Sequence, residues 1–177
     1  MLALYRDLHP QEDAAPDAAD VFATILSRED LTILLLEVDG SPVATTYLNI
    51  IPNLTRGAAP YAVIENVVVA KAWQGKGLGK RLMAATLEAA WKAGCYKVML
   101  LTGSKTPSTH AYYRACGFDP TAKQAYLARP PYQVRIHNER KSQPGVPSGA
   151  ESNRHTGASC RRRSKTEQLR RLKSEHL

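Results

Sequence analysis

Apolar residues gather in short runs along the first part of this chain, and these runs predict three strands. The runs cover residues 31–38, 42–51 and 61–69 and are rich in Val, Ile, Leu and Thr, of which the β-branched residues favour strands. Asp39 and Gly40 stand between the first two runs, and this dipeptide is a strong signal for a tight hairpin turn. We therefore expect a hairpin, then a loop, then the third strand.

A second pattern, with apolar residues three or four positions apart, predicts a helix over residues 77–93. Its inward face is expected to bury most of Leu78, Leu82, Ala85, Leu87 and Trp91. Gly94 follows the last periodic residue, as glycine commonly does where a helix ends. Because a helix crossover joins parallel strands, residues 96–102 are expected to form a strand parallel to its neighbour.

The same periodicity predicts two shorter helices near the start of the chain. Residues 1–9 resemble the end of a helix, with Leu2, Leu4, Tyr5 and Leu8 on one face. Residues 16–27 also have helical spacing. Pro16 suits the first helical position, and Val21, Phe22 and Ile25 are expected to face inward.

Thr106 and Pro107 fit the N-cap and the first position of a further helix. This helix is expected to run to about Cys116 and to end at Gly117. Residues 118–127 are then expected to form the last strand or strands.

A glycine-rich turn separates the strand at 61–69 from the following helix. Its glycines alternate, and cations lie beside them: Gly75, Gly77, Gly79, Lys76, Lys80 and Arg81. Such a turn exposes backbone N–H groups next to the positive end of a helix dipole, which favours an anion such as a diphosphate. The turn lacks both the Gly-Lys-Ser/Thr ending of a P-loop and the spacing of a dinucleotide fingerprint, so neither of those sites is predicted.

The length of 177 residues and the hydrophobic fraction of 44% indicate one domain with a core of its own. No apolar run reaches the length of a membrane span, and no secretory signal is seen. Cys95, Cys116 and Cys160 are widely spaced, which predicts reduced thiols in a cytoplasmic protein and no Cys-x-x-Cys metal site.

The net charge of +8 belongs almost wholly to residues 131–177, which hold 11 Lys or Arg and 4 Asp or Glu. This segment is rich in Ser, Asn, Gly and Arg, so we expect a disordered basic tail after a domain at residues 1–130. The clusters Arg161-Arg-Arg and Arg170-Arg-Leu-Lys allow contact with nucleic acid, although a solvated tail is the simpler interpretation.

Three motifs together resemble one protein family. They are Gln74-x-x-Gly77-x-Gly79, the strand-like run at 95–102, and Tyr112-Tyr-Arg-Ala-Cys-Gly-Phe118, and they stand in the family's order and spacing. Over about residues 1–130 the chain resembles the GNAT superfamily of acetyl-CoA-dependent N-acetyltransferases.

The resemblance implies an α/β fold of the α+β kind, with a central, mostly antiparallel sheet, a splayed parallel pair of strands, and flanking helices. In the family a strand comes before the helix that resembles residues 1–9. The first strand is therefore expected to be missing from a truncated domain, which would expose a sheet edge.

The resemblance also implies where acetyl-CoA lies. The pantetheine arm is expected along the backbone of Val67, Val68 and Val69, where an N–H would also polarise the thioester carbonyl. The pyrophosphate is expected on the turn formed by Gln74, Gly75, Lys76, Gly77, Leu78, Gly79 and Lys80. No metal is expected in this chemistry.

Two side chains are the candidates for catalysis. Glu65 stands in an apolar strand and matches the family's strand glutamate, so it is expected to remove the amine's proton, with burial raising its pKa. Alternatively it binds the acceptor's cation or pairs with Arg56. Tyr113 matches the family's second aromatic and is expected to protonate the leaving thiolate, the alternative being a buried structural role.

Neighbouring residues are assigned other roles. Asn66 is expected to face away from Glu65, because successive strand residues alternate. Tyr112 is expected to pack, His110 to be solvated, and the cysteines not to act as nucleophiles.

The function implied is direct transfer of an acetyl group to a primary amine of a small molecule or peptide. Homodimers are common in the family, so the resemblance also implies a possible homodimer. The acceptor stays open between an amino sugar, an aminoglycoside, a polyamine and a protein amine. The alternatives are a catalytically impaired CoA-binding sensor and a nucleic-acid-binding protein that acts through its tail.

Overall fold

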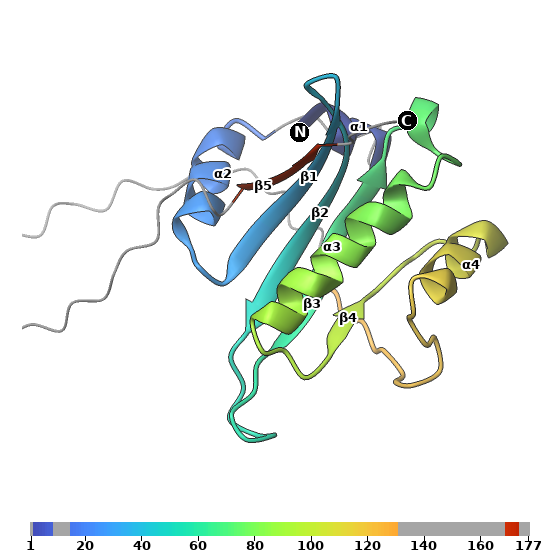
Figure 1. The fold of residues 1–177 in the computed structure, drawn as a ribbon. Helices are drawn as coiled ribbons and strands as arrows, with labels where there is room; N and C mark the ends of the chain where they lie inside the picture. Colours follow the sequence, from blue (N-terminus) through green and yellow to red (C-terminus); the bar gives the residue numbers. More distant parts are fainter. Residues whose placement is uncertain (1, 9–14, 131–168, 174–177) are drawn as a thin grey trace, which may run out of the picture. The chain divides into compact units, whose positions relative to one another are not determined.

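The computed structural model describes residues 2–8, 15–130 and 169–173 (Figure 1). The chain divides into two compact units, Met1–Lys123 with Arg163–Leu177, and Gln124–Arg162. The first unit holds every helix and strand described below. Of the second unit, residues 124–130 are described, and they have no helix or strand.

The predicted hairpin is confirmed. Strand β1 (Leu31–Val38) pairs antiparallel with β2 (Ser41–Ile51), and Val38 faces Ser41 across the turn. Asp39 and Gly40 both have positive φ, at 50° and 75°, the sign that a two-residue type I′ hairpin turn requires at both central positions. Strand β3 (Tyr61–Val69) then pairs antiparallel with β2, so the first three predicted strands are neighbours.

Helix α3 (Leu78–Lys92) crosses from β3 to β4 (Val98–Leu100), which is parallel to β3 as expected. The strand is shorter than the predicted 96–102, because pairing with β3 stops at the pair Ile64 and Leu100. The two strands therefore separate beyond this point, and the family's splayed parallel pair is confirmed.

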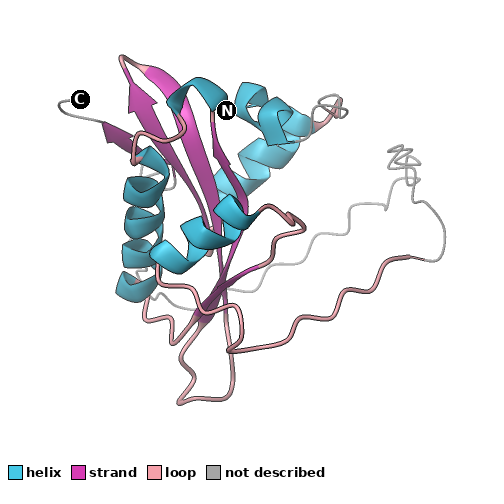
Figure 2. Ribbon diagram, turned by 90° about the vertical axis from the view of Figure 1, so that its right-hand side faces the viewer, coloured by secondary structure: helices cyan, strands magenta, loops and turns pink. Residues whose placement is uncertain are grey.

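Helices cover both faces of the sheet (Figure 2). Helix α3 packs on one face over a core that includes Leu34, Leu48 and Ile64. Helices α1 (Leu2–Leu8) and α2 (Ala18–Ser27) lie on the other face, around Leu4 and Ile33. The mixed sheet flanked by helices confirms the predicted fold class.

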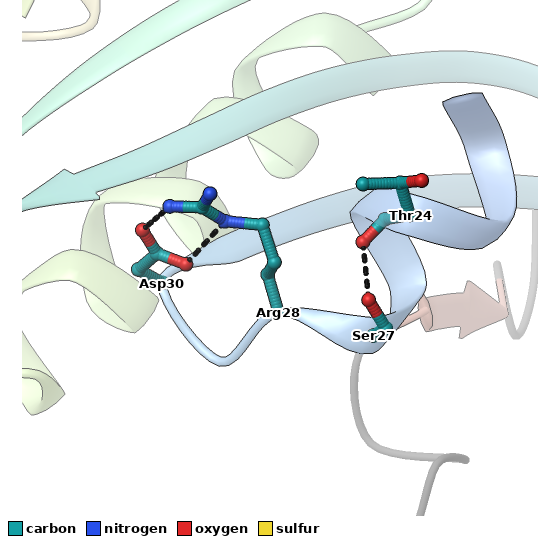
Figure 3. A network of polar contacts seen from close by, with 4 residues as sticks. All are labelled: Thr24, Ser27, Arg28 and Asp30. Atoms are coloured by element: carbon teal, nitrogen blue, oxygen red, sulfur yellow. Dashed lines mark hydrogen bonds and ion pairs between the residues drawn. The ribbon is translucent and has the colours of Figure 1, made fainter. Parts of the chain in front are cut away.

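The connection from α2 to β1 is held by local polar contacts (Figure 3). Ser27 Oγ donates to the Thr24 carbonyl at 2.8 Å, and Arg28 forms a two-bonded ion pair with Asp30. The hydrogen bond from Arg28 lowers the pKa of the Asp30 carboxyl. These contacts fix the point at which the chain enters the sheet.

Two predicted core residues face solvent instead. Trp91 is 50% exposed, because α3 lies on the sheet through small residues such as Ala89 and Ala90, and the next position points away. Val21 is 51% exposed, whereas Phe22 and Ile25 pack against the core cluster between the sheet and helices α1 and α2.

The last part of the described chain also differs from expectation. Helix α4 (Pro107–Ala115) is confirmed, but residues 118–127 form no strand, and Tyr126 and Leu127 are largely exposed. The strand expected over residues 118–127 is therefore not found.

A fifth strand comes from the predicted tail. β5 (Leu169–Lys173) pairs in parallel with β1, so the sheet order is β4-β3-β2-β1-β5. Disorder was expected at these five residues, and the missing first strand was expected to expose a sheet edge. The rest of the tail, at 131–168 and 174–177, lies outside the described residues. Strand addition uses main-chain groups, so the tail's polar composition did not reveal it.

Candidate active site between strands β3 and β4

A pocket opens where β3 and β4 separate. Its volume is about 310 Å³. The β3 side is formed by Ile64, Glu65, Asn66 and Val67, and the other lining residues are Leu8, Leu100, Leu101, Thr102, Gly103, Ser104 and Tyr113. The pocket therefore brings together the two side chains that the sequence singled out, one from the central strand and one from α4.

A β-bulge shapes the β3 side of this pocket. Val68 pairs with Thr45 and Glu65 pairs with Tyr47, so β3 has one residue more than β2 over this stretch. Asn66 has a φ of 52°, a left-handed conformation that asparagine tolerates better than most residues. The predicted alternation is therefore wrong here. The extra residue breaks the period of two, and Glu65 and Asn66 both line the pocket.

Glu65 is exposed, so the burial expected at this position is not found. Its neighbour across the sheet is Tyr47 on β2, on the face that carries α1 and α2. Arg56 lies in the β2–β3 loop and does not line the pocket, so the structure does not bring it to Glu65 there. The carboxylate of Glu65 is thus open to solvent and to a ligand in the pocket.

Tyr113 reaches the pocket from α4 and is partly buried. Burial raises the pKa of its phenol above the ordinary 10.0, and nearby Cys116 and Glu65 raise it further. Its ring packs edge-on against Phe118, with the ring centres 6.2 Å apart. The phenol is therefore protonated at neutral pH and can donate a hydrogen bond.

Tyr112 occupies a packing position, as expected. Its Oη donates to the Gly79 carbonyl at 2.9 Å, and burial raises the pKa of its phenol strongly. Burial also raises the pKa of the Cys95 and Cys116 thiols. Thiols with raised pKa values carry little thiolate at neutral pH, which agrees with the expectation that neither cysteine is a nucleophile.

Two glycines of the turn are required by the local structure as well as by the proposed anion site. Gly77 is the N-cap residue of α3 and has a φ of 77°, in the left-handed region. Gly79 has no such φ, but a Cβ there would lie 3.3 Å from side-chain atoms of both Val69 and Tyr112. The first glycine allows the chain to turn, and the second allows α3 to approach β3 and α4 closely.

The polar groups of the turn are partly committed. Gln74 Nε2 donates to the Val69 carbonyl at 3.0 Å, so this side chain ties the turn to the end of β3. The Lys76 ammonium lies 4.4 Å from the centre of the Trp73 ring. The N-cap residue of α3, Gly77, makes no side-chain capping bond, so the first-turn N–H groups of this helix can meet an anion. Leu78 is buried, so it can offer only its N–H.

His110 was expected to be solvated, and this is wrong. The residue is partly buried, and its Nε2 lies 2.9 Å from the carbonyl oxygen of Ser104. Thr102 and Ser104 also line the pocket. Neither was assigned a role from the sequence, because Thr102 is only the last residue of the strand-like run at 95–102 and Ser104 lies outside every motif.

Two kinds of feature are absent from the described residues. No group of three or more His, Cys, Asp or Glu side chains is arranged to hold a metal ion there. None of the helices described is long and apolar enough to cross a membrane.

Comparisons with known proteins agree with this geometry. Residues 1–118 match the acetyltransferase (GNAT) family. The chain is 38% identical over 109 residues to a probable glucosamine 6-phosphate N-acetyltransferase 2 from Oryza sativa subsp. japonica, which covers 59% of this chain and 64% of the relative. It is 28% identical over 121 residues to the aminoglycoside N(6')-acetyltransferase type 1 of Stenotrophomonas maltophilia, with 65% and 79% covered.

The fold agrees with a solved structure as well. A putative acetyltransferase from Agrobacterium tumefaciens superposes with a TM-score of 0.69 at 45% sequence identity, covering 73% of this chain and 90% of that one. The chain thus spans slightly less than two thirds of the rice relative but most of the bacterial structure. Because the family match extends over most of the chain and ends at Phe118, this protein belongs to the GNAT acetyltransferase family.

Proposed function

We propose that this protein transfers the acetyl group of acetyl-CoA to a primary amine of a small molecule by direct attack of the amine on the thioester. The observation that carries this proposal is the pocket at the gap between β3 and β4, where Glu65 and Tyr113 meet. The glycine turn that leads into α3 follows the same strand, which supplies a seat for a diphosphate next to the pocket.

The unpaired side of β3 supports the placement of the pantetheine arm. Val68 pairs with Thr45 on β2, but on the other side β4 pairs only as far as Ile64. The N–H and C=O groups that face the gap after Ile64 therefore have no strand partner among the described residues, and buried backbone groups need one. An amide-bearing arm would pair with them as an added strand does. The positions assigned to it are Val67, Val68 and Val69.

The pyrophosphate is assigned to the turn from Gln74 to Lys80. The N–H groups at the start of α3 and the charges of Lys76 and Lys80 favour an anion there. Gly75 and Gly77 have no side chains, and a Cβ at either position would meet nothing within 4 Å. The backbone of the turn is therefore open to a ligand at these two residues. Gln74 has a positioning part through its bond to the Val69 carbonyl.

In the chemical step, the amine nitrogen forms a bond to the acetyl carbon, and the bond from that carbon to sulfur breaks. Glu65 is assigned as the base that accepts the ammonium proton, through water because it is exposed. Tyr113 is assigned as the acid that gives its phenolic proton to the departing thiolate and regains one from solvent. A backbone N–H of β3 near Val67 is assigned to the oxyanion of the tetrahedral intermediate.

We further propose an amino sugar as the acceptor. Two relatives are named for glucosamine 6-phosphate and for aminoglycosides, and both compounds carry amines on sugar rings. An exposed Glu65 beside a solvent-open pocket suits a polar, cationic acceptor.

The test begins with acetyl-CoA binding by calorimetry in the wild type, Gly77→Asn and Gly77→Asp. Asparagine and aspartate have the same shape and both tolerate the left-handed φ of 77°, so the pair isolates the added negative charge. Binding that survives in Gly77→Asn and is lost in Gly77→Asp supports the diphosphate seat. Turnover is then measured as free thiol released with glucosamine 6-phosphate and with an aminoglycoside. A folded wild type that binds no acetyl-CoA would overturn the proposal.

A further inference from the structure

Ser104 uses all of its polar groups in hydrogen bonds. Its N–H donates to Thr102 Oγ1 at 3.2 Å, and its Oγ accepts from the Thr106 N–H at 3.2 Å. The same hydroxyl bonds Thr109 Oγ1 at 3.2 Å, and the Ser104 carbonyl lies 2.9 Å from His110 Nε2. One serine thus joins the chain after β4 to the first two turns of α4.

This serine also forms part of the pocket wall. Thr102, Gly103 and Ser104 line the β4 side of the pocket, beyond the point where β4 stops pairing. The segment has little packing to hold it, since a Cβ at Gly103 would meet nothing within 4 Å and Leu101 is 55% exposed. Its position therefore depends on the hydrogen bonds at Ser104.

The bond from His110 has a defined direction. A carbonyl oxygen only accepts, so Nε2 carries the proton and donates it. Both the neutral Nε2–H tautomer and the imidazolium can donate from this nitrogen, so the bond persists when the ring is protonated. His110 and Tyr113 are three residues apart on α4 and therefore lie on the same side of the helix.

We propose that His110 is a positioning residue for the acetyl-transfer site. Its Nε2–H holds the Ser104 carbonyl and so sets the distance between the pocket wall at 102–104 and Tyr113 on α4. His110 is not assigned any contact with substrate. The catalytic part of this inference rests on the proposed acetyltransferase function, whereas the effect on the wall does not.

The test compares His110→Leu with His110→Gln. Glutamine places an N–H donor at about the reach of Nε2, and leucine fills similar space without a donor. Both are good helix formers, so the helix itself is little affected. Hydrogen exchange of residues 101–106 is measured in both variants and the wild type, together with kcat and KM for acetyl-CoA and glucosamine 6-phosphate.

We expect His110→Leu to exchange faster over residues 101–106 and to lose roughly ten- to hundred-fold in kcat/KM, since a shifted wall misplaces the reacting groups. His110→Gln is expected to restore both, with a pH–rate profile of the wild-type shape. Unchanged exchange and activity in His110→Leu would overturn the proposal. Wild-type exchange with lost activity in His110→Gln would overturn it too, because the ring would then act in the chemistry.

The two proposals fail in different ways. If the wild type turns over none of the amines, the proposed function fails. Hydrogen exchange at residues 101–106 and acetyl-CoA affinity can still be compared between His110→Leu and His110→Gln. Equal exchange and equal affinity in the two variants would then overturn the positioning role. Faster exchange in His110→Leu alone would support the wall contact as a structural feature independent of that reaction.

Discussion

The phenol of Tyr112 donates a hydrogen bond to the carbonyl of Gly79 at 2.9 Å and so joins α4 to the start of α3. The two residues are 33 positions apart in the chain. A Cβ on Gly79 would lie 3.3 Å from Tyr112 Cε2, so the tyrosine ring fills the space that the glycine leaves open. The turn assigned to the pyrophosphate and the helix that carries Tyr113 are therefore held together by one packed contact.

Replacement of Gly79 by alanine tests this contact. Alanine gains about 1 kcal/mol of helix propensity over glycine, but overpacking in a tight site costs about 1–3 kcal/mol. Tyr112 is hydrogen-bonded and Val69 belongs to a central strand, so neither moves away easily. We expect a net loss of about 1 kcal/mol in urea unfolding and weaker acetyl-CoA binding in calorimetry.

Gly103→Ala is the matched control for stability. A Cβ at Gly103 meets nothing within 4 Å and its φ is not in the left-handed region, so the wild-type stability is expected to be kept. A Gly79→Ala protein at least as stable as Gly103→Ala would show that Tyr112 gives way at no cost.

The raised pKa of the Tyr112 phenol predicts how the stability of the protein changes at high pH. Burial raises the pKa of its phenol above the 10.0 of an unfolded tyrosine, so above that pH the unfolded chain loses a proton that the folded chain keeps. The free energy of unfolding therefore falls as pH rises past 10.0. Tyr112→Phe is expected to lose about 1 kcal/mol at pH 8 through the missing hydrogen bond.

The same variant is expected to fall less steeply between pH 10 and 11, measured by urea unfolding at several pH values. Tyr126→Phe, at a residue 87% exposed, is the control and is expected to behave as the wild type. Parallel curves for the wild type and Tyr112→Phe above pH 10 would contradict the assignment.

The predictability of this fold follows the range of the interactions. The hairpin at Asp39 and Gly40 and helix α3 were predicted because their signals lie within a few residues. The bulge at Asn66 was not, because an inserted residue is defined only against the register of β2. Asparagine within a run of valines is the only hint that the sequence offers.

The candidate site divides in the same way. Glu65 and Tyr113 were proposed from motifs, and both residues line the same pocket in the structure. His110 was misjudged because its partner, a backbone carbonyl of Ser104, leaves no mark in the sequence. Strand β5 was missed because pairing with β1 uses main-chain groups that every residue carries.

A buried hydroxyl pair in the core gives a third prediction. Thr46 Oγ1 and Thr86 Oγ1 are 2.7 Å apart with no exposed surface, and Thr86 donates its proton to the Leu82 carbonyl at 2.8 Å. Thr46 is therefore the donor to Thr86. Thr86→Val leaves that donor unpaired and is expected to cost about 1–3 kcal/mol, whereas Thr46→Val is expected to cost about 1 kcal/mol or less.

Urea unfolding of the two single variants and the double variant measures the pair. The double variant is expected to be no less stable than Thr86→Val, because removing Thr46 Oγ1 removes the unpaired donor. Strict additivity of the two single effects would show that the hydroxyls do not interact.

Truncation after residue 168 provides a fourth prediction. Without β5, the N–H groups of β1 that face it lose their partners along Ile33–Glu37. We expect faster hydrogen exchange at about every second amide of β1 and a greater tendency to associate, measured by light scattering. Removing only residues 174–177 is the control. Equal exchange of β1 in both truncated chains would contradict a role for β5 in covering this edge.

The roles assigned to Glu65 and Tyr113 lead to different kinetics. Loss of a general base lowers kcat by about 10²–10⁴-fold, so Glu65→Gln is expected to fall in this range with little change in KM for the amine. If Glu65→Gln instead mainly raises KM for the amine, Glu65 is a binding group for the ammonium and not the base. Tyr113→Phe is expected to lower kcat while acetyl-CoA still binds, because the ring keeps its contact with Phe118.

The pH dependence of the rate tests the role assigned to Tyr113. Because the pKa of Tyr113 is raised above 10.0, its phenol stays protonated throughout the neutral range, and its ionisation produces no loss of rate below pH 10.0. An alkaline limb below that pH that disappears in Tyr113→Phe would contradict this assignment.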